Sequence, residues 1–396
     1  MRAAVIGCGV AGMAAALALA RRGHEVTLLE AFVTPKPLGS GLLLQPSGLA
    51  AMRVLGLEAQ IRDLGAPIAR LDGRDLSGRR ILDMAYDHWR PGALGLGVHR
   101  GTLFQVLYQA VAQAGVQVLT GVEVVGVETL HRPVLVDAKG AQHGPFDLAV
   151  VADGSASRLR QVIRPRARAP VYPWGAVWAN VADPEGRFTG ALHQRFDAAT
   201  TMMGILPIGT GPDGVGHQAS LFWSLPVASM ANVFAGGLEA WRARAQAVWP
   251  EAGPLLAQLS LADFSNATYR DVSVGRWSRG AVTLLGDAAH GTSPQLGQGG
   301  NLALIDAVEL ADRLAPDRSA SASLARFQSA RRRQTGVYQL ASRALTPLFQ
   351  SQGPIGPLVR DLIFAPLARL PLLRGLSATV LTGMLRLGAT PRNLRP

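Results

Sequence analysis

The stretch from Gly286 to Asn301, GDAAHGTSPQLGQGGN, combines a carboxylate with several glycines just before an apolar helix pattern. A strand-like segment, 281–285, leads into this stretch, and the helix pattern occupies 302–314. Glycines let backbone N–H groups approach a ligand closely, and the N-terminus of a helix adds partial positive charge. We therefore expect the reactive end of a cofactor to lie along this stretch.

A second glycine motif, GCGVAG at residues 7–12, lies near the N-terminus between a strand pattern and a helix pattern. In such a motif Gly7 forms the turn, Gly9 admits a pyrophosphate and Gly12 packs the helix against the strand. The next strand pattern ends in Glu30, where an acidic residue can bind ribose hydroxyls. The segment predicts a dinucleotide-binding βαβ unit; the alternative is a glycine-rich turn of another α/β protein.

Composition narrows the class of protein. Of 396 residues, 48% are hydrophobic and 17% charged, which excludes wholesale disorder. The formal net charge of +12 comes from scattered arginines, and with only 6% aromatic residues the chain does not predict nucleic-acid binding. Cys8 is the only cysteine, so an intramolecular disulfide and a thiolate zinc site are excluded, and a cytoplasmic protein is expected.

Two apolar segments raise the question of membrane contact. Residues 3–20 carry no charge, as in a membrane span or a signal peptide, but glycines at motif spacing break the run. We therefore interpret this segment as part of a soluble βαβ unit. Residues 336–396 form basic, amphipathic patterns, which predict either helices that cover the sheet or join subunits, or peripheral contact with a membrane surface.

Strand and helix patterns predict an α/β protein around the two glycine motifs. In the first part of the chain the predicted strands are 71–84 as a hairpin, 116–119, 123–129, 133–137 and 147–152, the predicted helices are 47–55 and 103–112, and residues 39–41 and 45–46 are expected to form a loop. Residues 171–274 then alternate apolar and polar positions, with helix patterns at 237–248 and 255–259. This change predicts an inserted antiparallel sheet that forms a substrate platform.

Candidates for catalysis in this platform are weak. His193, Arg195 and His217 show neither metal-ligand nor nucleophile spacing, and each is more often structural than catalytic, so we expect no metal site. Arg100 begins a helix pattern, where the helix dipole favours an acid. Either an anionic partner or a solvated position would explain it.

Three motifs therefore follow one another along the chain: residues 7–12 with Glu30, Asp153-Gly154 with Arg158, and 286–301. Together they resemble the single-component (class A) FAD-dependent aromatic monooxygenases, related to p-hydroxybenzoate hydroxylase and the ubiquinone-biosynthesis hydroxylases. The resemblance covers about residues 1–335. It implies a Rossmann-like FAD-binding domain of the glutathione-reductase type, an inserted antiparallel-sheet substrate domain and C-terminal helices.

The resemblance also implies domain limits and residue roles. The FAD-binding domain would comprise 1–70, 97–168 and 276–335, the substrate domain 71–96 and 169–275, and the C-terminal helical segment 336–396. Gly7, Gly9, Val10, Ala11 and Gly12 would hold the pyrophosphate, Glu30 the adenosine ribose, Arg100 the phosphate or ribityl oxygens and Val124 the adenine. Asp153 and Gly154 would touch FAD and NAD(P)H, Gly286 and Asp287 the ribityl chain, Pro294 the flavin ring, and Gly299, Gly300 and Asn301 its pyrimidine edge. Many relatives carry an arginine in the loop after the first acidic residue, and residues 41–45 offer none.

The activity implied is hydroxylation of an aromatic or phenolic small molecule. NADH or NADPH would reduce FAD, and O2 would form a flavin C4a-hydroperoxide that transfers one oxygen atom in a dry site. Alternatives are a flavin-dependent halogenase or a prenyl-chain reductase on the same scaffold, or a non-catalytic flavin-binding protein. The halogenase signature Trp-x-Trp-x-Ile-Pro is absent from the sequence. The chain is expected to be a monomer or a homodimer.

Overall fold

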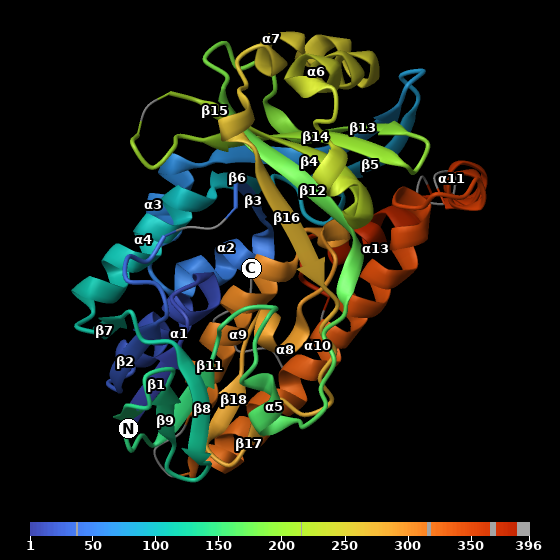
Figure 1. Ribbon diagram of the computed structural model, residues 1–396. Coiled ribbons are helices and arrows are strands. Elements are labelled where there is room, and N and C mark those ends of the chain that lie inside the picture. The colour runs from blue at the N-terminus through green and yellow to red at the C-terminus, as the bar shows by residue number, and fades with distance from the viewer. Residues whose placement is uncertain (37–38, 215, 315–317, 365–369, 386–396) are drawn as a thin grey trace.

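The computed structural model describes residues 1–36, 39–214, 216–314, 318–364 and 370–385. These residues form a mixed α/β fold, in which a mostly parallel sheet occupies the lower part of the view and a larger, mostly antiparallel sheet the upper part (Figure 1). The α/β class predicted from the sequence is confirmed.

Within the described ranges the lower sheet has six strands, in the order β17-β18-β11-β1-β2-β7. Their bounds are β1 Arg2–Ile6, β2 Glu25–Glu30, β7 Gln117–Thr120, β11 Leu148–Val151, β17 Ser278–Arg279 and β18 Val282–Leu284. All neighbours except β17 and β18 pair in parallel. Ile6, Leu29, Val151 and Leu284 stand in register, so the carboxyl ends of these strands meet at one edge.

Helices pack against this sheet and bury its strands. They are α1 Val10–Ala20, α4 Arg100–Gln113, α5 Arg160–Ile163, α8 Asp287–His290 and α9 Gly299–Arg313. A small antiparallel sheet lies beside them, with strands β8 Val124–Thr129, β9 Val134–Asp137 and β10 Gln142–His143. Residues 3–6 are almost completely buried, which explains why β1 is apolar at every one of these positions.

The upper sheet has the strand order β16-β12-β15-β14-β13-β4-β6-β3, and β5 pairs with β4 at its side. The bounds are β3 Gly41–Leu44, β4 Ala66–Asp75, β5 Arg80–Ala85, β6 Gly95–His99, β12 Val171–Ala182, β13 Gly190–Asp197, β14 Thr201–Gly209, β15 Gln218–Pro226 and β16 Ser265–Arg270. The predicted hairpin at 71–84 and the antiparallel sheet within 171–274 are confirmed. The sequence assigned Gly41 to a loop, but it begins β3, and β14 was not predicted.

Each face of the upper sheet packs against helices. One face is covered by α6 Gly237–Val248, α7 Gly253–Leu256 and the short turn Pro250–Ala252. The opposite face packs against the end of the long helix α10 Ala320–Phe349, which Figure 1 shows running from the lower sheet to the upper one. Helix α2 Pro46–Val54 contacts β3 and β6, and η5 Pro294–Leu296 packs against α10. The remaining helices are α3 Glu58–Leu64, α11 Ile355–Val359, the π-turn Arg360–Phe364 and α13 Pro371–Leu381, and the short 3-10 turns are Tyr86–His88, Val227–Asn232 and Leu261–Asp263.

The C-terminal part is helical over most of its described residues, as predicted. Among the described residues, no helix combines the length and the apolarity needed to cross a membrane. The predicted domain limits remain a prediction, and the limit between residues 70 and 71 falls within β4.

Candidate active site

The ends of three parallel strands bring the three sequence motifs together. A Cβ atom built on Gly7 would lie 2.6 Å from the carbonyl oxygen of Ala152 and 3.0 Å from Asp153 Cα. A Cβ on Gly286 would lie 2.9 Å from Ala11 Cβ. The turns after β1, β11 and β18 therefore touch one another, at the edge of a parallel sheet where α/β proteins bind their ligands.

The glycines of the first motif play different roles. Gly7 has a φ angle of +103°, which residues with a side chain rarely adopt. A Cβ on Gly12 would lie 1.8 Å from the Gly7 carbonyl oxygen, so α1 can approach the turn only with glycine there. A Cβ on Gly9 or on Gly154 would meet no atom of the described chain within 4 Å. Open space beside Gly9, at the N-terminus of α1, leaves room for an anionic ligand.

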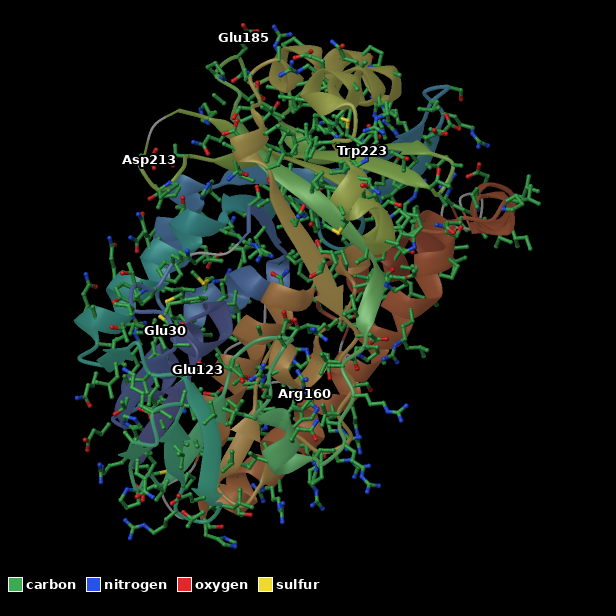
Figure 2. The ribbon with its side chains drawn as sticks, viewed as in Figure 1. Glu30, Glu123, Arg160, Glu185, Asp213 and Trp223 are labelled. Carbon is green, nitrogen blue, oxygen red and sulfur yellow. The ribbon has the colours of Figure 1, made fainter. Side chains whose placement is uncertain are left out.

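Glu30 ends β2 beside this turn, in the lower half of Figure 2. Its carboxylate accepts hydrogen bonds from Cys8 N at 2.7 Å and Phe32 N at 2.9 Å. Burial, together with the charge of Glu30, raises the pKa of Cys8 to about 12, so the side chain stays a thiol and packs as a small apolar group. Val124 begins β8 and is buried. It lies close to the end of β2, since Val122, two residues earlier, donates its backbone N–H to the carbonyl oxygen of Glu30 at 2.9 Å.

The stretch 286–301 folds into the short helix α8, the 3-10 turn η5 and the start of α9. Asp287 is exposed, and a Cβ on Gly299 would lie 3.7 Å from its Oδ1, so the carboxylate stands beside the N-terminus of α9. Pro294 begins η5 and is partly exposed. Asn301 is fully buried, accepts a hydrogen bond from Gln45 N at 2.8 Å and donates to the carbonyl oxygen of Leu43 at 3.0 Å. Its side chain therefore fixes the junction of β3 and α2 against α9.

Arg100 lies across the loop that precedes β3. Its backbone N–H donates to the carbonyl oxygen of Ser40 at 2.8 Å, and a Cβ on Gly39 would lie 3.0 Å from Arg100 Cδ. The preceding residue, His99, caps α4, because its Nδ1 accepts from Gly101 N at 2.9 Å. Arg100 therefore lies at the start of α4, beside the loop that leads into β3.

The pKa of His99 makes this cap sensitive to pH. Burial lowers the pKa of His99, and Asp213 only partly opposes the shift. The unfolded chain therefore takes up the proton first as pH falls, so stability present at neutral pH should be lost below the ordinary histidine pKa. Thermal unfolding between about pH 7.5 and about pH 5.5 should show a steeper loss for the wild type than for His99→Asn, which keeps a capping side chain. If the stability of the two proteins falls equally steeply with pH, His99 does not contribute to the pH dependence of stability.

Arg160, rather than Arg158, is the arginine that the fold buries after Asp153-Gly154. Arg158 is exposed, whereas Arg160, labelled in Figure 2, is 3% exposed. Its guanidinium donates to the carbonyl oxygens of Ala288 at 2.8 Å and Ser155 at 3.0 Å. The sequence analysis named Arg158 with this motif and missed Arg160, because only burial separates the two arginines.

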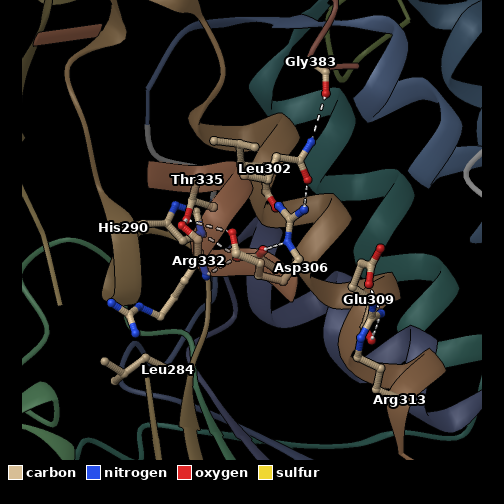
Figure 3. A network of polar contacts seen from close by, with 12 residues as sticks. Leu284, His290, Leu302, Asp306, Glu309, Arg313, Arg332, Thr335 and Gly383 are labelled. Atoms are coloured by element: carbon tan, nitrogen blue, oxygen red, sulfur yellow. Dashed lines mark hydrogen bonds and ion pairs between the residues drawn. The ribbon is translucent and has the colours of Figure 1, made fainter. Parts of the chain in front are cut away.

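Asp306 is a second buried charge that the sequence analysis missed (Figure 3). His290 Nε2 lies 2.5 Å from Asp306 Oδ2, Arg331 Nε donates to Oδ1 at 2.6 Å, and Gly286 N donates to Oδ2 at 3.2 Å. Burial raises the pKa of Asp306, but the charges of His290 and Arg331 outweigh burial and hold it below its usual value. The carboxylate thus fixes the Gly286 turn. The sequence did contain a signal for this buried charge, because Asp306 interrupts the apolar helix pattern 302–314.

The three weak catalytic candidates lie away from these turns. On β13, His193 and Arg195 face the side of the upper sheet that α6 and α7 cover: the guanidinium of Arg195 stacks on Trp249, 4.5 Å from the ring centre. His217 is exposed in the loop before β15. The structure therefore does not bring these residues to the motif residues, and among the described residues no cluster of His, Cys, Asp and Glu could hold a metal ion.

Several buried polar atoms near the motifs make no hydrogen bond within the described chain. They are Asp153 Oδ1, Gln45 Nε2, Ser47 Oγ, Gln295 Nε2 and Gln298 Oε1. Buried polar atoms usually have a partner, so these atoms point to a bound group that completes the site. Burial also raises the pKa of Asp153. Asp153 adjoins Gly154 in the turn after β11, whereas Gln45, Ser47 and Gln298 lie at the starts of α2 and α9.

Comparison with known families decides what this group is. The family described as FAD binding domain matches residues 1–343. The chain belongs to this family. Membership confirms FAD as cofactor and the class of FAD-dependent monooxygenases that the three motifs predicted. The unpaired polar atoms and the open glycines of the FAD binding domain fit such a cofactor.

Named relatives support the same assignment, and a solved structure shows the same fold. An FAD-dependent urate hydroxylase of Klebsiella pneumoniae is 28% identical over 337 residues, covering 84% of this chain and 86% of the relative. A probable 2-heptyl-3-hydroxy-4(1H)-quinolone synthase of Rhodococcus erythropolis is 28% identical and covers 82% and 83%. The fold is similar to that of Klebsiella pneumoniae HpxO, solved with FAD and uric acid, with a TM-score of 0.80, 23% identity and 97% coverage of both chains.

Proposed function

We propose that this FAD-dependent monooxygenase uses NADH or NADPH and O2 to hydroxylate an aromatic or phenolic small molecule. The observation that carries the proposal is the meeting of the turns after β1, β11 and β18, which brings the three sequence motifs together at one edge of the parallel sheet. The relatives support the substrate class, because urate and quinolones are flat aromatic heterocycles.

In this proposal FAD lies along the edge of a Rossmann-like sheet of the glutathione-reductase type. Its pyrophosphate would occupy the space beside Gly9, with Glu30 at the adenosine ribose and Asp287 at the ribityl chain. The flavin ring would lie between η5 and the β3–α2 junction, where Gln45 and Gln298 offer unpaired polar atoms. The domain limits that the resemblance implies are part of this proposal.

When bound, FAD supplies the redox chemistry by accepting a hydride and activating O2. The chain holds and shields it. Backbone N–H groups of Gly299 and Gly300, at the N-terminus of α9, favour negative charge at the ring edge. The sheet face opposite α6 presents apolar rings, including Trp178 and Phe222, whose centres are 4.8 Å apart. Such a surface excludes water and suits a flat aromatic substrate.

The test is turnover by the purified protein. It should be yellow, and a panel of phenols, quinolones and purines should contain members that stimulate NADH or NADPH oxidation. The product should be one oxygen atom heavier than the substrate and should take its label from isotopic O2. Protein that binds no FAD, or whose NAD(P)H oxidation no aromatic compound stimulates, would contradict the proposal. Chloride-dependent products would favour the halogenase, and reduced products without added oxygen the prenyl-chain reductase.

The C-terminal segment supports a further part of this proposal, peripheral contact with an apolar surface. Ile355, Leu358 and Leu362 are 73%, 58% and 66% exposed on neighbouring turns. A membrane that carries an apolar substrate would provide such a surface. A cytoplasmic location and a monomeric or dimeric state remain predictions from the sequence.

A further inference from the structure

The C-terminal turn, residues 381–383, begins with the last residue of α13 and lies against the candidate site. Its three consecutive carbonyl oxygens accept hydrogen bonds from three different elements. Gln298 Nε2 donates to the carbonyl oxygen of Leu381 at 2.5 Å, Ser47 N to that of Thr382 at 3.1 Å, and Gln334 Nε2 to that of Gly383 at 3.2 Å. Ser47 lies in the first turn of α2, where backbone N–H groups lack a partner within the helix.

Gly383 fits this position closely. Its φ is +76°, and a Cβ atom there would lie 2.0 Å from Ser47 Oγ and 2.9 Å from Gln298 Oε1. Figure 3 shows Gly383 at one end of the network that leads through Asp306 to His290. The connection runs through Gln334, which bonds both Gly383 and Arg331. The turn is therefore joined to each of the two segments that flank the proposed flavin ring.

The side chain of Leu381 completes an apolar cluster. Leu381 is 2% exposed and packs with Leu43 of β3 and with Leu206 and Ile208 of β14. Tyr86 belongs to the same cluster and donates its hydroxyl hydrogen to Gln45. The turn thus adds one apolar residue to the sheet face that is next to the β3–α2 junction.

We propose that the C-terminal turn is part of the reaction site of this enzyme. It positions Gln298, which precedes α9, and Ser47, in the first turn of α2, and it closes the neighbouring apolar face against water. This inference rests on the proposed function, because the loop that Gln298 ends is the one assigned to the flavin ring. Oxygen transfer in a flavoenzyme depends on a dry site, so a displaced turn should admit solvent to the flavin.

The test compares two glycine substitutions in the full-length, FAD-loaded protein. Gly383→Ala should displace the turn, whereas Gly375→Ala, within α13, would place its Cβ no closer than 3.9 Å to any neighbour. Gly383→Ala should keep bound FAD but show about threefold steeper quenching of flavin fluorescence by iodide and an altered visible circular dichroism spectrum. Gly375→Ala should match the wild type in both measurements. Wild-type values for Gly383→Ala would overturn the inference.

A second pair keeps the inference testable if Gly383→Ala does not fold. Leu381→Ala opens the cluster without changing the backbone, and its control is Leu376→Ala on the exposed side of α13, where the side chain is 52% exposed. Leu381→Ala should increase iodide quenching, and equal quenching in the two variants would overturn the inference. Wild-type protein that binds no FAD would contradict the proposed function itself, and this inference with it.

Discussion

Replacement of Asp306 by Asn should lower the free energy of unfolding by about 3–5 kcal/mol, because it leaves a buried guanidinium without its anion. Asp306 is 0% and Arg331 2% exposed, so water cannot replace the lost partner. The substitution also weakens the acceptor for Gly286 N and places an amide N–H or a neutral oxygen opposite His290. Urea unfolding of the apoprotein at neutral pH measures the effect without a contribution from FAD.

The same substitution at Asp312 is the control. Asp312 lies on the same helix and pairs with Arg22, whose side chain is 39% exposed, so Asp312→Asn should cost about 1 kcal/mol or less. Because the pKa of Asp306 is held below its usual value, the wild-type advantage should be full above the usual carboxyl range and decline toward acid. The role of Asp306 would be contradicted if both variants lost a similar free energy of unfolding. It would also be contradicted if the stability advantage of the wild type over Asp306→Asn grew as the pH falls.

The motif turns could be predicted from the sequence because their glycines encode backbone geometry. Gly7 and Gly12 are required by the close approach of α1 to the turn after β1, and this requirement is local. Strand patterns similarly predicted the hairpin of β4 and β5 and the alternating strands of the upper sheet. β14 was missed because residues 202–209 are buried throughout and show no alternation.

Other parts of the site depend on contacts between distant segments, which no local pattern contains. Gln298 and Leu381 meet across 83 residues, and Asn301 and Leu43 across 258. Arg158 and Arg160 are equivalent as sequence, and only the packing of Ala288 against the turn after β11 selects Arg160. His193 and Arg195 were attractive for their chemistry, but pairing with β14 fixes the face on which they lie.

Alanine at Gly9 should weaken FAD binding about tenfold or more while leaving the stability of the apoprotein nearly unchanged. A Cβ at this position meets no atom of the described chain within 4 Å, so the unliganded fold tolerates it. In the proposed complex the same space holds the pyrophosphate, and a methyl group there would keep the phosphate oxygens away from the N–H groups that begin α1. Titration of flavin fluorescence gives the dissociation constant of FAD.

Alanine at Gly12 separates this effect from a general disturbance of the turn. Its Cβ would lie 1.8 Å from the Gly7 carbonyl oxygen, so α1 must move and the apoprotein should lose about 1–3 kcal/mol of stability as well as FAD affinity. If the Gly9→Ala variant has the wild-type dissociation constant for FAD, the pyrophosphate does not occupy the space beside Gly9. If the Gly9→Ala apoprotein is as unstable as the Gly12→Ala apoprotein, the space beside Gly9 is filled by the protein. Steric overlap within the fold, rather than with the cofactor, would then explain the loss of FAD affinity in both variants.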